Sequence, residues 1–191
     1  MHGGAGSPVS SSSFLTIRSR SGPGRKAQTA SVGWRKSLLK AVGHRAIFLH
    51  DRKVPGTRGN IDHLAIAASG IWVIEAKNYV GMVEHRDKGG WFRPDYHLCV
   101  GDRDRSKLAD GLTWQVAAVR EALVGSDVLV NAALCFVGAE WRLFAKPFQH
   151  NGVWVTWAKQ LAAMIAAPGP LSDIDVANVA EHLATSLPTA A

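Results

Sequence analysis

Three residues with ionisable side chains, Asp62, Glu75 and Lys77, stand in an otherwise apolar part of the sequence. A half-buried charge costs several kcal/mol unless it is paired or holds a metal ion, so such residues need a reason to be there. Carboxylates are hard oxygen donors that suit Mg²⁺. The residue types therefore indicate a site where two carboxylates bind a divalent cation beside an amine.

A β-hairpin is the element that must bring these three side chains together. The apolar runs 61–67 and 71–76 flank Ser69-Gly70, and β-branched residues on both sides of a glycine-containing turn favour a hairpin. A two-residue turn there pairs Lys77 with Asp62 and places Asp62 and Glu75 as diagonal neighbours, roughly 7–8 Å apart. Because side chains alternate along a strand, all three share one face. The alternative is a surface salt bridge on an amphipathic hairpin.

Longer stretches around these residues resemble a known family. Twelve residues separate Asp62 from Glu75-Ala76-Lys77, as in the PD-(D/E)XK nuclease superfamily. The flanking sequences, from Pro55 to His63 and from Trp72 to Tyr79, closely resemble the NERD (nuclease-related) domain. The resemblance runs from about Val32 to Leu187.

The resemblance implies a fold and a reaction. It implies a single α/β domain over residues 31–187, with a central mixed β-sheet flanked by helices, and a Mg²⁺-dependent endonuclease acting on DNA, with Mn²⁺ as the alternative metal. Asp62, Glu75 and the backbone carbonyl of Ala76 would bind the metal, and Lys77 would orient the attacking water. Gln115 falls where the family has a helical glutamine, whose amide suits a metal-bound water or a phosphate oxygen. An ordinary solvated glutamine is the alternative.

One position departs from the family. NERD domains usually carry a Gly-Glu pair near the first helix, and that glutamate can complete the metal site, whereas this chain has Gly33-Trp34. The nearest acid after it is Asp51. The site then either binds Mg²⁺ with more water in its shell, which that ion tolerates, or binds metal weakly. In the second case the domain would be a DNA-binding or regulatory module.

Positive charge is concentrated at the N-terminal end. The chain carries a net charge of +7, and no acid precedes Asp51. A basic segment attracts phosphate without sequence preference, which predicts nucleic acid as the partner; a solvated tail or an ordinary surface loop is the alternative. The cations expected to contact DNA lie on the first helix and on the loop leading to Asp62: Arg35, Lys36, Arg52, Lys53 and Arg58.

The rest of the chain shows alternating helix and strand patterns. Trp91 and Phe92 either stack on bases or pack against a sheet. The predicted order is a disordered Ser/Gly-rich tail 1–30, helix 31–42, strand 46–50, loop 51–59, the hairpin, strands 79–84 and 96–100 as a continuing meander, a helix to about 124, strands 128–137 and 153–156, helices 157–166 and 171–187, and a frayed end 188–191.

Composition limits the class of protein. The chain has 191 residues, of which 47% are hydrophobic, enough for one globular domain. It has no apolar run of membrane-spanning length and no signal-peptide core near Met1, so we expect a cytoplasmic protein without a membrane partner. Cys99 and Cys135 lack metal-ligand spacing and are expected to be buried free thiols. Nothing in the sequence indicates an oligomeric state.

Overall fold

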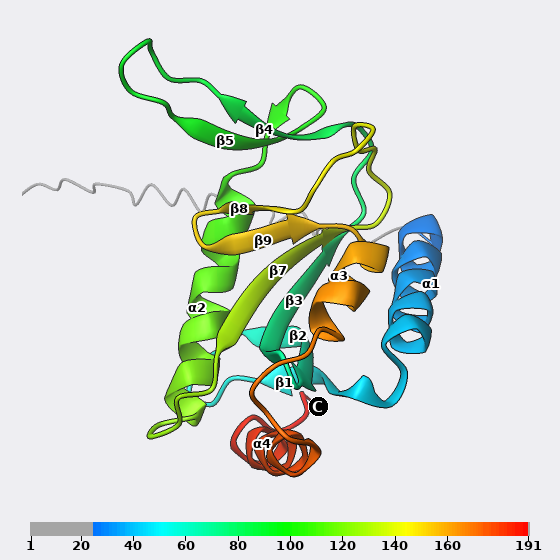
Figure 1. The fold of residues 1–191 in the computed structure, drawn as a ribbon, viewed down its shortest axis with the longest axis vertical. Helices are drawn as coiled ribbons and strands as arrows, with labels where there is room; N and C mark the ends of the chain where they lie inside the picture. Colours follow the sequence, from blue (N-terminus) through cyan, green and yellow to red (C-terminus); the bar gives the residue numbers. More distant parts are fainter. Residues whose placement is uncertain (1–24, 191) are drawn as a thin grey trace, which may run out of the picture.

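The computed structural model describes residues 25–190, and within them the chain forms an α/β domain around a six-stranded sheet (Figure 1). The helices and strands are, in order, α1 (Arg25–Val42), the short 3-10 helix η1 (Gly43–Arg45), β1 (Ala46–Lys53), β2 (Asn60–Ala67), β3 (Gly70–Lys77), β4 (Val83–Asp87), β5 (Tyr96–Val100), β6 (Arg103–Asp104), α2 (Lys107–Ala122), β7 (Val130–Phe136), β8 (Phe148–His150), β9 (Val153–Thr156), α3 (Ala158–Ile165) and α4 (Asp173–Ser186).

The main sheet is mixed, as predicted. Its strand order is β1-β2-β3-β7-β9-β8. β1, β2 and β3 pair antiparallel, β3, β7 and β9 pair parallel, and β8 joins β9 antiparallel. Parallel strands need a crossover, and α2 provides the one between β3 and β7. The sheet therefore places β3, which carries Glu75 and Lys77, at its centre.

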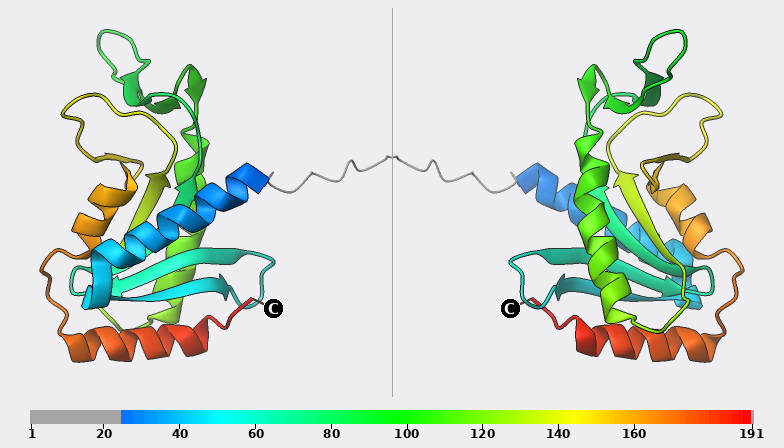
Figure 2. Two further views of the ribbon diagram at one scale, coloured as in Figure 1. Left: turned by 90° about the vertical axis from the view of Figure 1, so that its right-hand side faces the viewer. Right: turned by 90° about the vertical axis from the view of Figure 1, so that its left-hand side faces the viewer.

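Two apolar layers cover the two faces of this sheet. Leu64 and Val73 pack with Leu112 of α2 on one face, and Ala65 and Ile74 pack on the other, where α1 and α3 lie. Figure 2 shows α2 and α1 on opposite sides of the strands, with α4 running across the end near β1 and β2. Alternate residues of one strand thus enter different layers, as the pleat requires.

A separate three-stranded sheet, β4-β5-β6, corrects the predicted meander. The physical reason is that β7 already occupies the free edge of β3. The chain therefore leaves the main sheet after Lys77 and forms β4 and β5 beyond it (Figure 1). Trp91 and Phe92, in the loop between these strands, are 95% and 91% exposed, so they do not pack against a sheet.

The first helix is longer than predicted. α1 begins at Arg25, whereas we expected Ser31 to cap it, so residues 25–30 belong to the helix and not to a disordered tail. These six residues include Arg, Lys, Ala and Gln, which are good helix formers, and Ser31 is therefore an internal position. The remainder of the predicted tail, 1–24, lies outside the described residues.

The first strand also extends further than predicted. β1 continues through Lys53 because residues 188–190 bond to its outer edge: Lys53 N–H donates to Pro188 O and Ala190 N–H donates to Asp51 O. The expected loop over residues 51–53 and the expected fraying of 188–190 are both wrong for this reason. The free edge of a strand readily accepts such a segment.

Arg52 ties this edge together and is not a free DNA-contacting cation. Its side chain is buried, and its guanidinium donates to Leu187 O at 2.6 Å, to Ala184 O at 2.6 Å and to Thr189 Oγ1 at 3.0 Å. All of these acceptors belong to the C-terminal end of the chain. The expectation that Arg52 contacts phosphate is therefore wrong, since its donors are already used within the fold.

We expect Arg52→Ala to lower the free energy of unfolding by about 3 kcal/mol, because it leaves buried carbonyls without their charged donor. Urea unfolding followed by circular dichroism measures this change. Lys53→Ala, at an exposed neighbouring position of the same strand, is the matched control and should change stability by less than about 0.5 kcal/mol. Equal stability of the two variants would contradict the assignment.

Two smaller expectations are met. Cys99 and Cys135 are free and buried, and Ser172 with Asp175 forms the capping box expected at the start of α4. Within residues 25–190, no helix combines the length and the apolar character needed to cross a bilayer.

Candidate functional site

The hairpin places Asp62 and Glu75 on the same face, with a register that differs from the predicted one. Leu64 pairs with Val73 and Ala67 pairs with Gly70, so the two-residue turn is Ala68-Ser69 and not Ser69-Gly70. Gly70 is instead needed where β3 starts, because the Leu129 carbonyl fills the space of a side chain there. Extended by one residue, this register sets Asp62 opposite Glu75, whereas we expected Lys77 opposite Asp62.

The two strands separate where the acids lie. The β2–β3 pairing ends at His63 and Ile74, one residue before Asp62 and Glu75, while β3 remains paired with β7 through Lys77. Lys77 O accepts from Val137 N–H on the β7 side. Because successive carbonyls point to opposite sides of a strand, the Ala76 carbonyl points toward the gap. Both carboxylates and this carbonyl thus lie where the β2–β3 pairing ends, and this end of the pairing is called the opening below.

Electrostatic interactions link the three ionisable side chains. Lys77 Nζ forms an ion pair with Glu75 Oε1, and the two side chains are 26% and 19% exposed. Asp62 is exposed at the edge of the opening, yet its pKa is raised, first by the loss of part of its water and then by the negative charges of Glu75 and Asp51, while Lys77 lowers it. Negative charge therefore gathers where a cation would be stabilised.

Asp51 is an acid that sequence reasoning placed in a loop. It lies between His50 and Arg52, which pair with His63 and Ile61, so it stands opposite Asp62 across β1 and β2. Its backbone has a φ of 50°, in the left-handed region that non-glycine residues adopt infrequently. We did not expect β1 and β2 to pair as far as residue 53. That pairing would have placed Asp51 beside the acids.

Gln115 faces the same side of the sheet as the acids. It belongs to the buried side of α2, with Leu112 and Val119, and is not the solvated glutamine of the alternative. Only 8% of the residue is exposed, and its Oε1 has no hydrogen-bond partner among the described residues. Next to it, the Trp114 indole fills the side-chain space of Gly59, just before β2. A buried amide oxygen without a partner suits a bound water or ligand.

Trp34, which we expected at the position of the family's helical glutamate, points away from the acids. It is 5% exposed and packs edge-on against His63, with ring centroids 5.3 Å apart. His63 alternates with Asp62 and therefore lies on the α1 face. Burial, then the charges of His50 and Arg35, lower the pKa of His63 to about 4. This neutral, buried ring fits a structural role.

The predicted DNA-contacting cations fall into separate groups. Lys53 and Arg58 are exposed at the β1–β2 connection, and Lys36 is exposed on α1. Arg35 is half-buried. It lies near His50, since its positive charge lowers the pKa of that histidine, although burial lowers that pKa more. The structure thus brings Asp62, Glu75 and Lys77 together, and leaves the α1 cations on the other side of the sheet.

The oxygen donors of this site suit a hard divalent cation that is bound by only a few protein ligands. Among residues 25–190, no group of three or more His, Cys, Asp or Glu side chains is arranged to hold a metal ion. Two carboxylates and a carbonyl around one opening, with an unpartnered amide oxygen on the covering helix, are oxygen donors of the kind that Mg²⁺ uses while keeping several waters. Asp62, Glu75 and Ala76 are the residues that would hold it.

A mixed sheet flanked by helices, with two acids and a lysine on adjacent central strands, defines a nuclease-like α/β domain. The family model described as the nuclease-related domain, NERD, matches residues 34–137, more than half of the chain. The chain therefore belongs to the NERD family. The match is shorter than the expected span of about 32–187. Searches of curated proteins and of solved structures gave no match to the chain.

We expect Asp62→Asn to raise the melting temperature at pH 7, without divalent metal, by about 1–3 °C. The raised pKa means that the charged carboxylate is less stable in the folded chain than in the unfolded chain. The difference between the proteins should vanish as the pH falls below the ordinary aspartate pKa, where Asp62 is neutral in both states. Calorimetric melts across pH measure it, with the exposed Asp127→Asn as control; an equal gain there would contradict the prediction.

Proposed function

We propose that this NERD protein is a Mg²⁺-dependent phosphodiester hydrolase that cuts DNA. The observation that supports the proposal most strongly is the shared face of Asp62 and Glu75 at the point where β2 and β3 separate, with Lys77 paired to Glu75. Two carboxylates beside one amine suit the charge changes of phosphodiester hydrolysis. Family membership supports a nuclease-related activity.

Each residue of the site has a role in hydrolysis that its chemistry suits. Asp62, Glu75 and the Ala76 carbonyl would hold the metal, which would supply charge stabilisation and a more acidic water when bound. Lys77 donates from its ammonium group to the attacking water and to a phosphate oxygen. Gln115, whose Oε1 has no partner among the described residues, accepts from the water and keeps it in line.

Substrate approach is supported by the surface charges. Arg58 and Lys53 lie exposed at the connection that leads into β2 and Asp62, where they contact phosphates beside the bond to be cut. Arg35 and Lys36 contribute to general attraction of the polyanion from the α1 side. Such contacts position the strand without reading its sequence.

A second candidate is a nucleic-acid-binding module with little or no catalysis. It is favoured by Trp34, which is buried against His63 and offers no acid to the opening. The experiment that separates the candidates incubates the purified chain with plasmid and linear DNA under Mg²⁺, under Mn²⁺ and under EDTA. Metal-dependent nicking or cutting supports the hydrolase; salt-sensitive binding with no cleavage under either metal contradicts it and supports the module.

A further inference from the structure

A polar pocket of about 360 Å³ begins directly after Lys77, where β3 ends. One wall is formed by Asn78 and Tyr79, and the other by the β5–β6 turn and the residues just before α2, including Arg103 and Arg105. The walls are fixed to each other, because Gly101 N–H donates to Met82 O at 2.9 Å. The pocket is therefore a built feature next to the proposed active site.

Two guanidinium groups give this pocket its charge. Neither Arg103 nor Arg105 forms an ion pair with a carboxylate of the described part of the chain. Arg105 stacks over the Tyr79 ring, 4.6 Å from its centroid, and its Nε is buried without a hydrogen-bond acceptor among residues 25–190. The planar fork of a guanidinium group matches the geometry of a phosphate group.

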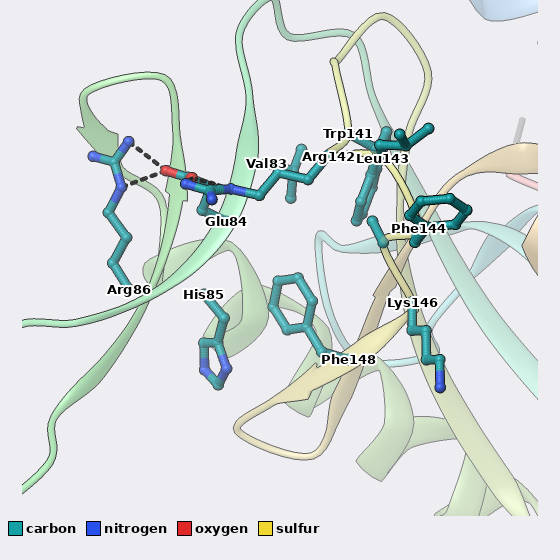
Figure 3. Close-up of a pocket in the computed structure, with 11 residues that line it drawn as sticks. Val83, Glu84, His85, Arg86, Trp141, Arg142, Leu143, Phe144, Lys146 and Phe148 are labelled. Atoms are coloured by element: carbon teal, nitrogen blue, oxygen red, sulfur yellow. Dashed lines mark hydrogen bonds and ion pairs between the residues drawn. The ribbon is translucent and has the colours of Figure 1, made fainter.

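A larger pocket nearby shows the contrast. This cavity, of about 500 Å³, lies between β4 and the segment 141–148 and also contains two arginines (Figure 3). There Glu84 lies between Arg86 and Arg142 and accepts hydrogen bonds from both. Both arginines of that pocket therefore already have a carboxylate partner, although Lys146 also lines it, whereas the acid lining the smaller pocket, Asp102, forms no ion pair with Arg103 or Arg105.

We propose that the Arg103–Arg105 pocket binds a backbone phosphate of the nucleic-acid strand, next to the phosphate that is cut at Asp62 and Glu75. The inference rests on the proposed function, because it names a substrate contact of that same site. A phosphate in the pocket supplies the negative partner that the guanidinium groups of Arg103 and Arg105 lack within the described residues, and the pocket follows Lys77 directly along the chain. The strand is thereby held across the end of β3.

Binding of a fluorescent single-stranded oligonucleotide in EDTA tests the pocket independently of cleavage. We expect Arg103→Ala with Arg105→Ala to weaken binding about tenfold, and to lower the salt dependence by roughly one phosphate contact. Arg105→Lys, which keeps the charge and loses the fork, should fall between. Arg93 is exposed in the β4–β5 loop, and Arg93→Ala, which removes one positive charge outside the pocket, should bind like the unchanged protein. Circular dichroism melts verify that each variant folds.

Two further arms identify the source of the phosphate. In a series of oligonucleotides, one linkage at a time is replaced by an uncharged methylphosphonate. Replacement at a single linkage should weaken binding to the unchanged protein, and this loss of affinity should disappear in the double variant. If inorganic phosphate competes through the arginines while no linkage matters, free phosphate is the ligand and the strand assignment is wrong.

The results that would refute the phosphate-binding pocket differ from those that would refute the proposed hydrolase activity. Unchanged binding in the double variant, together with metal-dependent cleavage by the unchanged protein, overturns the pocket alone. Arginine-dependent binding without cleavage under Mg²⁺ or Mn²⁺ leaves the pocket standing and overturns the hydrolase.

Discussion

Replacing Lys77 by alanine is expected to slow DNA cleavage by about a thousandfold, while DNA binding changes little. The ammonium group lies beside Glu75 on the face shared with Asp62, so it is the described cation best placed for charge that develops on the reacting phosphate. Its loss removes an interaction that matters most in the transition state, which lowers the rate more than the affinity.

The cleavage assay needs a control that separates Lys77 from general charge effects. Lys159→Ala removes the same charge at an exposed position of α3, which is far from Lys77 in the sequence. This variant should cut DNA at the unchanged rate. Anisotropy measurements in EDTA establish whether binding is retained. Cutting that persists in Lys77→Ala at the rate of the unchanged protein would mean that another site, or a contaminating nuclease, is responsible.

The second large effect is expected on metal binding. Glu75→Ala should weaken Mg²⁺ and Mn²⁺ binding at least tenfold in calorimetric titration, because it leaves Asp62 as the single carboxylate at the gap between β2 and β3. Binding should also weaken as the pH falls through the raised pKa of Asp62, since protonation removes a ligand charge. Glu181→Ala, exposed on α4, is the matched control.

The titration also decides what Trp34 means. Metal binding by the unchanged protein that Glu75→Ala removes would show that the site works without an acid on α1. Equal binding by both proteins would contradict the assignment of Glu75, and no binding by the unchanged protein would support the nucleic-acid-binding module. Asp51, opposite Asp62 across β1 and β2, adds negative charge beside Asp62.

The shared face of Asp62 and Glu75 was predictable although their pairing was not. Moving the two-residue turn from Ser69-Gly70 to Ala68-Ser69 shifts the partner of each residue by two positions. Side chains repeat every two residues in a strand, so the face is preserved while the neighbour changes. Local sequence sets this periodicity, but the turn position depended on Leu129, which approaches Gly70 from a distant part of the chain.

The sequence by itself determined the alternation of strands and helices and the presence of two acids and a lysine on the central hairpin. Those features depend on side-chain periodicity and residue type, which are local properties. The tertiary structure decided what the arginines contact: Arg52 bonds to the C-terminal end, whereas Arg103 and Arg105 line one pocket with Asn78 and Tyr79. It also turned Trp34 toward His63. Each of these outcomes depends on contacts between segments far apart in the chain, and no local pattern encodes them.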